Sequence, residues 1–225
     1  MLFLLVCLLS LNLSAQDEVR KLDSFDVLSV SGGFNVDVFQ GEPKAEITVE
    51  RGELDAISMH VRNGELQIKY ENKKWGFNNG SHKINIDLYV PNLEAINTSA
   101  GASVYGEFLF NSNDFSADAS SGSSISIEVR ATDLEVDVSS GATVEIEGST
   151  KNLEVDVSSG ASFNGKKLEA REVEADASSG ASAKVWATKS IDANASSGAS
   201  IKYKGNPSST DLDSGKWSGG SIKKI

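Results

Sequence analysis

The sequence predicts an all-β protein: a right-handed parallel β-helix (β-solenoid) with short strands and Ser-Ser-Gly corners, whose N-terminal part contains some antiparallel strands. Three observations support this fold class. A corner tripeptide recurs about every 19 residues, apolar and polar residues alternate on both sides of it, and the chain has 20 Gly but only 3 Pro. Because alternation with period two is the side-chain repeat of a strand, each unit consists of two short strands joined at a corner.

The corner tripeptide is Ser-Ser-Gly or a close variant. Glycine suits a corner that needs a positive φ, and serine hydroxyls can hydrogen-bond the backbone there. Ser or Thr also stands two residues after every corner, where we expect it to satisfy corner backbone groups rather than to form a ligand-binding hydroxyl ladder. The corner glycines are Gly101, Gly122, Gly141, Gly160, Gly180, Gly198 and Gly219.

The positions seven, five and three residues before each corner glycine, and three residues after it, are apolar and vary in size. Stacked interior positions need this variation if neighbouring layers are to interdigitate. A unit without a helix cannot bury its apolar face alone, so it must stack on copies of itself, one rung per unit and about 4.8 Å apart. An antiparallel sandwich is the alternative, but hairpins would not need the same corner at the same phase. The column seven residues before the corner contains Phe115, Leu134, Leu153, Val173, Ile191 and Leu212.

Composition divides the chain into three parts. Residues 1–15 begin with the apolar run MLFLLVCLLSLNL and end with small residues, which is typical of a secretory signal peptide cut before Gln16, although a buried first strand is the alternative. Residues 16–91 form an N-terminal β region, acting as a cap or as the first rungs, and residues 92–225 form the solenoid repeats. We therefore expect an exported protein in the periplasm, at the cell surface or outside the cell.

The first half of the chain is strand-like without the strict repeat. Residues 25–41 look like a degenerate rung with Ser31-Gly32-Gly33 at the corner. Asn63-Gly64 between two alternating segments predicts a two-residue hairpin. We expect this antiparallel part to cap or flank the solenoid, because an open solenoid end is an unpaired strand edge.

Charge and residue content exclude several classes of function. A net charge of −11 argues against nucleic-acid binding, since an acidic surface repels phosphate. The single Cys7 cannot form an internal disulfide, and no later stretch is apolar enough to span a membrane. The two histidines, His60 and His82, belong to no metal or triad pattern, so we expect a protein that is not an enzyme and has no cofactor.

The most site-like column stands four residues before the corners. Carboxylates stacked about 4.8 Å apart repel one another, and a Ca²⁺ ion would relieve that repulsion. The alternative, which we favour, is a solvated outer face, because alternation points this column outward and the Gly-Gly-x-Gly-x-Asp repeat of calcium-binding solenoids is absent. The column contains Asp118, Asp137, Asp156 and Asp176, with Asn97 and Asn194 at its ends.

Trp75 and Phe77 stand in a polar segment, residues 71–82, of a chain that has few aromatic residues. Exposed, they could stack on a sugar or on a partner surface; folded back, they could plug the end of the solenoid. The sequence supports the two readings equally.

Charge is unevenly distributed along the repeats. Residues 114–176 contain 14 acidic and 5 basic residues, a net of −9, whereas residues 177–225 contain 3 acidic and 7 basic residues, a net of +4. Because the two regions have opposite net charge, this asymmetry could steer self-association between molecules. A simple solvated surface is the interpretation we favour.

Three motifs resemble a known family. They are VSGGFNVDVFQGE near the start, PNLEAINTSAGASV in the middle, and repeated S-G-A-S corners that end in SGGSIKKI. Over residues 22–225 the chain resembles the putative auto-transporter adhesin, head GIN domain family, with Gly33-Phe34-Asn35 at the tripeptide of the family name. The resemblance implies a β-helical fold and export in a Gram-negative bacterium, and it carries no catalytic residues.

From these observations we expect a non-enzymatic, exported solenoid that acts in adhesion, surface binding or cell-envelope structure. Its partner would be a glycan or a protein at the cell surface. The alternative is a carbohydrate-binding or carbohydrate-active module that uses the loop around Trp75.

Overall fold

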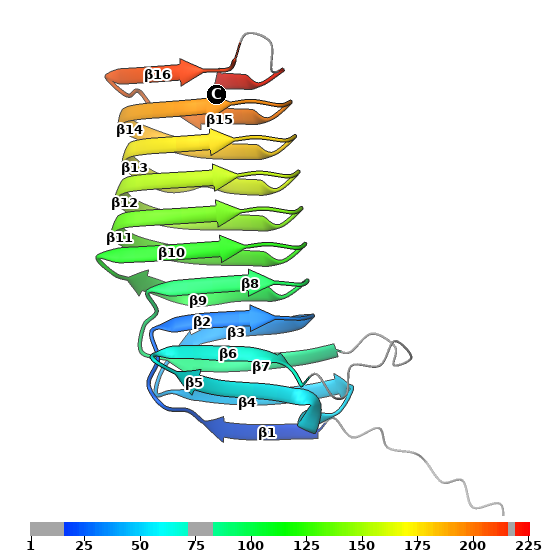
Figure 1. Ribbon diagram of the computed structural model, residues 1–225. Coiled ribbons are helices and arrows are strands. Elements are labelled where there is room, and N and C mark those ends of the chain that lie inside the picture. Colours follow the sequence, from blue (N-terminus) through cyan, green and yellow to red (C-terminus); the bar gives the residue numbers. More distant parts are fainter. Residues whose placement is uncertain (1–15, 72–82, 216–218) are drawn as a thin grey trace, which may run out of the picture.

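Short strands stack into a long rod, with one pair of strands per layer (Figure 1). The computed structural model describes residues 16–71, 83–215 and 219–225. The predicted signal peptide and the segment with Trp75 and Phe77 lie outside the described residues. In the described part of the chain, no helix has the length and apolar character needed to cross a membrane.

The second half of the chain is a parallel β-solenoid, as predicted. Neighbouring units pair in parallel and in register; for example, Val136 lies beside Val155, and Val155 lies beside Ala175. Strands β11 to β14 are long because each runs on from the strand after one corner to the strand before the next. The strands are β8 (Ala95–Ser99), β9 (Ser103–Asn111), β10 (Asp114–Ala119), β11 (Ser124–Val138), β12 (Thr143–Val157), β13 (Ser162–Ala177), β14 (Ser182–Ala195), β15 (Ser200–Lys204), β16 (Ser209–Asp213) and β17 (Ser221–Lys224).

The N-terminal strands continue the same rod. The β2–β3 pair forms a rung around the Ser31-Gly32-Gly33 corner, as the sequence indicates, and it lies between the β6–β7 pair and the β8–β9 pair. The chain therefore passes through this part of the rod out of sequence order. The elements are β1 (Gln16–Lys21), β2 (Val27–Ser31), β3 (Phe34–Gln40), β4 (Lys44–Arg51), the 3-10 turn η1 (Leu54–Ala56), β5 (Ile57–Arg62), β6 (Glu65–Tyr70) and β7 (Lys83–Val90).

The predicted antiparallel pairing is found at this end of the rod. Strand β5 pairs antiparallel with β6, and Asn63-Gly64 joins them with positive φ at both residues (52° and 79°), the conformation of a type I′ hairpin turn. Strands β1, β4 and β7 also pair antiparallel in that order. Phe34 of the Gly33-Phe34-Asn35 tripeptide is fully buried and stacks on Tyr70 with ring centroids 4.3 Å apart, so it belongs to the core.

The rod has two long faces, which we call the first sheet and the second sheet. The first sheet contains the strand before each corner, in the order β5-β6-β2-β8-β10, then the later halves of β11 to β14, and finally β16. The second sheet contains the strand after each corner, in the order β1-β4-β7-β3-β9, then the earlier halves of β11 to β14, and finally β15 and β17.

Backbone hydrogen bonds join successive corners. At five consecutive corners, the amide of the glycine donates to the carbonyl of the residue before the next corner glycine, at 3.0 to 3.2 Å. That residue is itself left-handed: Ser140, for example, has φ 52° and Gly141 has φ 73°. Backbone carbonyls, not serine hydroxyls, satisfy these glycine amides, whereas at one corner the Ser120 amide does donate to a serine hydroxyl, Ser123 Oγ (3.1 Å). Ser124 Oγ, two residues after a corner, donates to Ser103 Oγ (3.0 Å) in the preceding rung.

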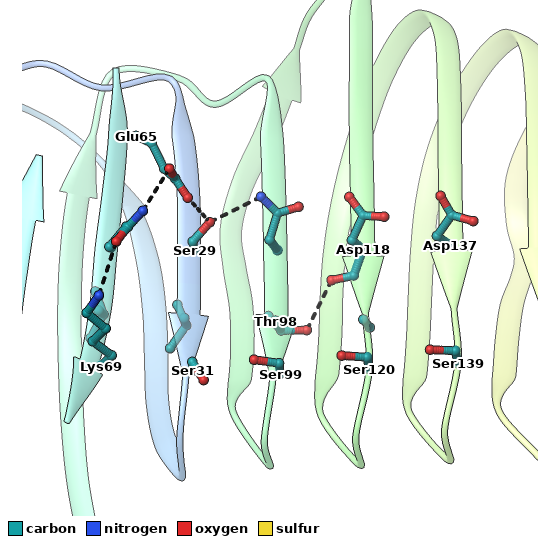
Figure 2. A pocket seen from close by; sticks show the side chains of 15 residues that line it. Ser29, Ser31, Glu65, Lys69, Thr98, Ser99, Asp118, Ser120, Asp137 and Ser139 are labelled. Atoms are coloured by element: carbon teal, nitrogen blue, oxygen red, sulfur yellow. Dashed lines mark hydrogen bonds between the residues drawn. The ribbon is translucent and has the colours of Figure 1, made fainter. Parts of the chain in front are cut away.

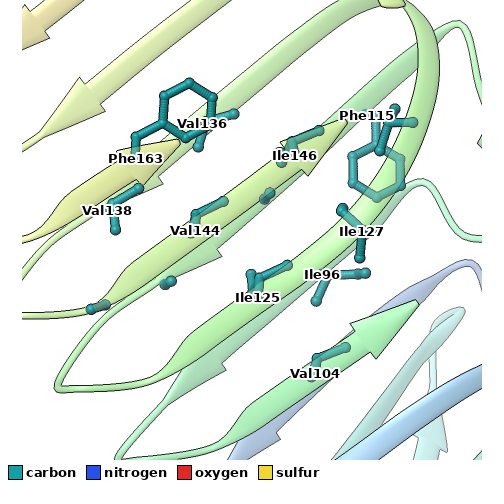
Figure 3. Packing of buried hydrophobic residues seen from close by; sticks show 14 of the residues in the cluster. Ile96, Val104, Phe115, Ile125, Ile127, Val136, Val138, Val144, Ile146 and Phe163 are labelled. Atoms are coloured by element: carbon teal, nitrogen blue, oxygen red, sulfur yellow. The ribbon is translucent and has the colours of Figure 1, made fainter. Parts of the chain in front are cut away.

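The core is a set of apolar columns that run along the rod between the two sheets (Figure 3). In the column three residues after the corner, fully buried Phe163 lies between Val144 and the smaller Ala183, so side-chain sizes alternate as close packing requires. The assignment of Leu212 to the column seven residues before the corner is wrong. Leu212 pairs with Ala193, five residues before its own corner, because the last unit holds two extra residues between β16 and Gly219. Leu212 is 40% exposed.

Gly148 provides a test of the close approach between rungs. It has φ 113°, and a Cβ atom there would lie 2.1 Å from the Val129 carbonyl oxygen of the neighbouring rung. We expect Gly148→Ala to lower the free energy of unfolding by about 2–4 kcal/mol, from backbone strain and overpacking together. Urea denaturation followed by circular dichroism measures the change.

Gly160→Ala is the matched control. Gly160 also has positive φ, but a Cβ atom at this corner would meet nothing within 4 Å. We therefore expect Gly160→Ala to lower the free energy of unfolding only by the cost of placing an alanine in left-handed backbone, about 1–2 kcal/mol. Equal losses for the two variants would contradict a steric role for Gly148.

Candidate functional site

A shallow polar groove of about 370 Å³ crosses five strands of the first sheet (Figure 2). It runs from β6 through β2, β8 and β10 to the later half of β11. Because these strands are parallel and in register, corresponding residues line up into two rows across the strands.

One row of the groove supplies carboxyl and amide groups and one hydroxyl group. The register aligns Gln67, Ser29, Asn97, Asp118 and Asp137 in that order. The other row is a floor of small hydroxyl side chains with one lysine at its end. It contains Lys69, Ser31, Ser99, Ser120 and Ser139. The short serine side chains leave space above the sheet, and the longer Lys69 stands at the β6 end of the row.

A chain of hydrogen bonds fixes the β6 end of the groove. Ser29 Oγ donates to Glu65 Oε1 (2.5 Å), and Asn97 Nδ2 donates to Ser29 Oγ (3.1 Å). Gln67 Nε2 donates to the other oxygen of Glu65 (3.0 Å). The hydrogen bonds from Ser29 and then Gln67 lower the pKa of Glu65, so this wall of the groove carries a fixed negative charge.

Asp118, toward the β11 end of the groove, has a raised pKa, in contrast to the lowered pKa of Glu65. Partial burial, then the charge of neighbouring Asp137, a hydrogen bond with Asp137 and the charge of Glu135 raise the pKa of Asp118 to about 6. The Asp118 carboxyl is therefore close to half protonated in mildly acidic conditions and can then donate as well as accept a hydrogen bond.

Below the floor, Thr98 and Ser123 form a buried polar pair. Their hydroxyl oxygens lie 2.9 Å apart, and Ser123 Oγ also donates to the Thr98 carbonyl oxygen (3.1 Å). Ser123 occupies the position after the corner glycine that is alanine in the neighbouring units, Ala102 and Ala142. This pair ties the β8 rung to the next one directly beneath the groove.

The groove offers hydrogen bonds from both ends and along its floor. The lining residues include no histidine or cysteine, and the residues Ser29 and Asn97 separate Glu65 from Asp118. This arrangement suits the binding of a polar, hydroxyl- or amide-bearing surface.

The structure brings together two of the four aspartates predicted as a column. All four are in register, with Asp118 and Asp137 in the groove and Asp156 and Asp176 farther along the rod. Partial burial, then the charges of Asp137 and Asp176, raise the pKa of Asp156. Among the described residues, no group of three His, Cys, Asp or Glu side chains is arranged to hold a metal ion.

The sequence did not reveal Glu65, Gln67, Lys69 and Ser29 as members of this site. They reach it because β2 lies beside β8 and β6 lies beside β2, in an order that differs from the order of the chain. The degenerate corner at Ser31-Gly32-Gly33 was the available signal that β2 belongs to the stack.

The shifted pKa of Asp118 makes a testable contribution to stability. Its folded pKa lies above its unfolded value, so the folded state takes up a proton between about pH 6 and pH 4 that the unfolded chain does not. The destabilisation due to Asp118 is thus fully present above pH 6 and disappears as the pH falls to about 4. After allowance for solvent screening, we expect Asp118→Asn to raise the free energy of unfolding at pH 7 by about 1 kcal/mol, and to have little effect at pH 4.

Urea denaturation at both pH values measures this difference. The matched control is Asp192→Asn, an exposed carboxylate of the same sheet outside the groove, for which we expect changes below about 0.5 kcal/mol at both pH values. A stabilisation by Asp118→Asn that is the same at pH 4 and pH 7 would contradict the assignment.

Solved structures share this fold. A crystal structure of a putative adhesin from Bacteroides fragilis superposes with a TM-score of 0.83 at 22% sequence identity, covering 94% of this chain and 97% of that chain. A putative adhesin from Parabacteroides merdae gives a TM-score of 0.72 at 17% identity, with coverages of 95% and 97%. A putative lipid binding protein from Parabacteroides distasonis gives 0.63 at 20% identity, with coverages of 95% and 98%.

No curated protein matches the chain. The family model of the putative auto-transporter adhesin, head GIN domain, in contrast, matches residues 24–207. This match spans both the N-terminal rungs and the repeats, and it confirms the resemblance seen in the sequence motifs. The chain therefore belongs to the putative auto-transporter adhesin, head GIN domain family.

Proposed function

We propose that this protein is an exported, non-enzymatic solenoid that acts in adhesion, and that the groove on its first sheet is the contact surface. The family assignment and the adhesin names of structural neighbours support an adhesion role. The observation that carries the proposal is the groove itself. It is a hollow across five stacked strands, lined mostly by residues with hydroxyl, amide and carboxyl groups, together with Val30, Ile68 and Ala119.

The chemistry of the groove favours a polar partner. Its floor is formed by serines, and its walls hold Glu65, Lys69 and Asp118. Desolvating such groups against an apolar chain would leave them without hydrogen-bond partners, which costs about 1–3 kcal/mol for each group. A glycan or the polar surface of a protein at a cell surface can instead return those hydrogen bonds.

Localisation provides the first test. If the protein acts in adhesion, protease added to intact cells should degrade it, and an epitope on its first sheet should be accessible to antibody without permeabilisation. Immunoblotting of shaved and fractionated cells measures both. Protection in intact cells, with degradation only after the outer membrane is opened, would contradict adhesion.

A groove-filling variant provides the second test. Ser99→Gln combined with Ser120→Gln fills the floor without changing charge, so we expect binding to immobilised mucin, fibronectin, collagen or envelope polysaccharide to weaken at least tenfold, which corresponds to about 1.4 kcal/mol. Biolayer interferometry of the purified protein measures the affinity.

The matched control places the same change on the opposite face. Ser162 and Ser182 are partly exposed residues of the second sheet, so Ser162→Gln with Ser182→Gln should leave the affinity within about twofold. Unchanged binding by the groove variant, or no binding of the wild-type protein to any of these surfaces, would contradict the proposal.

A further inference from the structure

The second sheet holds a row of lysines near the C-terminal end of the rod. Lys184, Lys202 and Lys223 are direct neighbours in the parallel register, one on each of three successive rungs; we call them the basic ladder. In-register pairing places their side chains about 4.8 Å apart along the rod. Like charges at directly opposed positions are unfavourable.

The basic ladder has no internal counter-charge. Two other lysines of the second half have one, since Lys167 pairs with Glu147 (2.5 Å) and Lys189 pairs with Glu172 (2.6 Å). Among the described residues, no carboxylate forms an ion pair with any member of the basic ladder. Beside it, Lys204 lies over the Trp186 ring, 3.8 Å from the centroid.

The first sheet holds the complementary row. Five carboxylates follow one another in register on consecutive rungs, and all five are exposed. We call them the acidic ladder. They are Glu135, Glu154, Glu174, Asp192 and Asp211.

Repulsion is already felt within the acidic ladder of the single molecule. The pKa of Glu154 is raised, chiefly by desolvation and then by the charges of Glu174 and Glu135, with Asp156 and Asp137 adding to them. The row of aspartates two residues closer to the corner therefore strengthens the negative potential of this face. A row of cations placed over it would relieve the repulsion at every rung.

The two ladders match each other in sign and in pitch. Both are built on parallel, in-register strands, so both repeat at the same spacing of about 4.8 Å. They lie on opposite sheets, so one molecule cannot bring its own ladders together. We propose that the basic ladder of one copy of this protein docks onto the acidic ladder of a second copy, so that the rods associate side by side.

The geometry sets both the strength and the form of this association. Three rungs with strands of about five residues cover roughly 250 Å² per partner, well below the roughly 800 Å² of a stable interface. The contact is therefore weak and sensitive to salt. Because the two docking surfaces differ, the contact is heterologous, and each added copy leaves one ladder of each kind free for the next.

Charge reversal with mixing tests the proposal. At about 0.01 M salt, where the screening length is roughly 30 Å, we expect the weight-average mass of the wild-type protein to rise with concentration in sedimentation velocity; at about 1 M salt it should return to the monomer value. Lys184→Glu/Lys202→Glu/Lys223→Glu should be monomeric at low salt, and so should Glu135→Lys/Glu154→Lys/Glu174→Lys. Mixed in equal amounts, the two variants should associate at least as strongly as the wild type, because each restores the partner surface that the other lacks.

A dispersed variant controls for net charge. Lys21→Glu/Lys151→Glu/Lys166→Glu makes the same charge change at three exposed lysines outside both ladders, and it should associate within about threefold of the wild type. Circular dichroism melts of every variant identify any that fail to fold.

Three outcomes would overturn the proposal. They are a monomeric wild-type protein at low salt, a mixture that stays monomeric, and equal loss of association in the dispersed variant. A monomeric wild type whose basic ladder instead binds heparin would assign the ladder to a polyanion. The adhesion assays use the groove and not these ladders, so the two proposals succeed or fail separately.

Discussion

The backbone hydrogen bonds that hold each corner above the next are the constraint on which the rest of this structure depends. At five consecutive corners, the glycine amide donates to a carbonyl in the following rung, and two left-handed residues make the turn that points it there. A serine in that conformation costs about 1–2 kcal/mol relative to ordinary backbone. The hydrogen bonds of the stacked amides and the burial of the apolar columns offset this strain. The columns also fix the register, because a shift of one residue would turn every apolar side chain outward.

In-register stacking forces like residues to lie beside like residues. For apolar side chains this is favourable, provided that sizes alternate, as Phe163 and Ala183 do. For charged side chains it is unfavourable: after desolvation, which is the largest cause, the charges of neighbouring carboxylates raise the pKa values of Asp118, Glu154 and Asp156 further. A repeat that builds a uniform core therefore also builds uniform rows of charge, and such rows are features that a partner can recognise.

The sequence was informative wherever the repeat was strict, and less so where it was broken. The period of the corners and the apolar alternation predicted the parallel stack, the column that contains Val144 and Phe163, and the register of the four aspartates. The Ser31-Gly32-Gly33 corner and the Asn63-Gly64 hairpin were also recognisable, since both are local signals. The position of the β2–β3 rung between two later pairs was not, because the order of rungs in space is a long-range property that no local pattern encodes. Leu212 was misplaced for a related reason: counting back from Gly219 ignores the two extra residues that the register reveals.

That out-of-order rung explains why the candidate site lies where it does. If the N-terminal strands stacked in chain order, β6 would lie directly beside β8, and Ser29 and Ser31 would no longer stand between Lys69 and Ser99. The groove occupies the β6 to β11 part of the first sheet, whereas the acidic ladder begins at β11 and continues toward β16. A second copy seated on the later rungs would thus leave most of the groove open. Rods joined side by side would present many grooves at once. Binding of one groove would raise the effective concentration of its neighbours at the partner surface, so that weak individual contacts give a higher overall affinity.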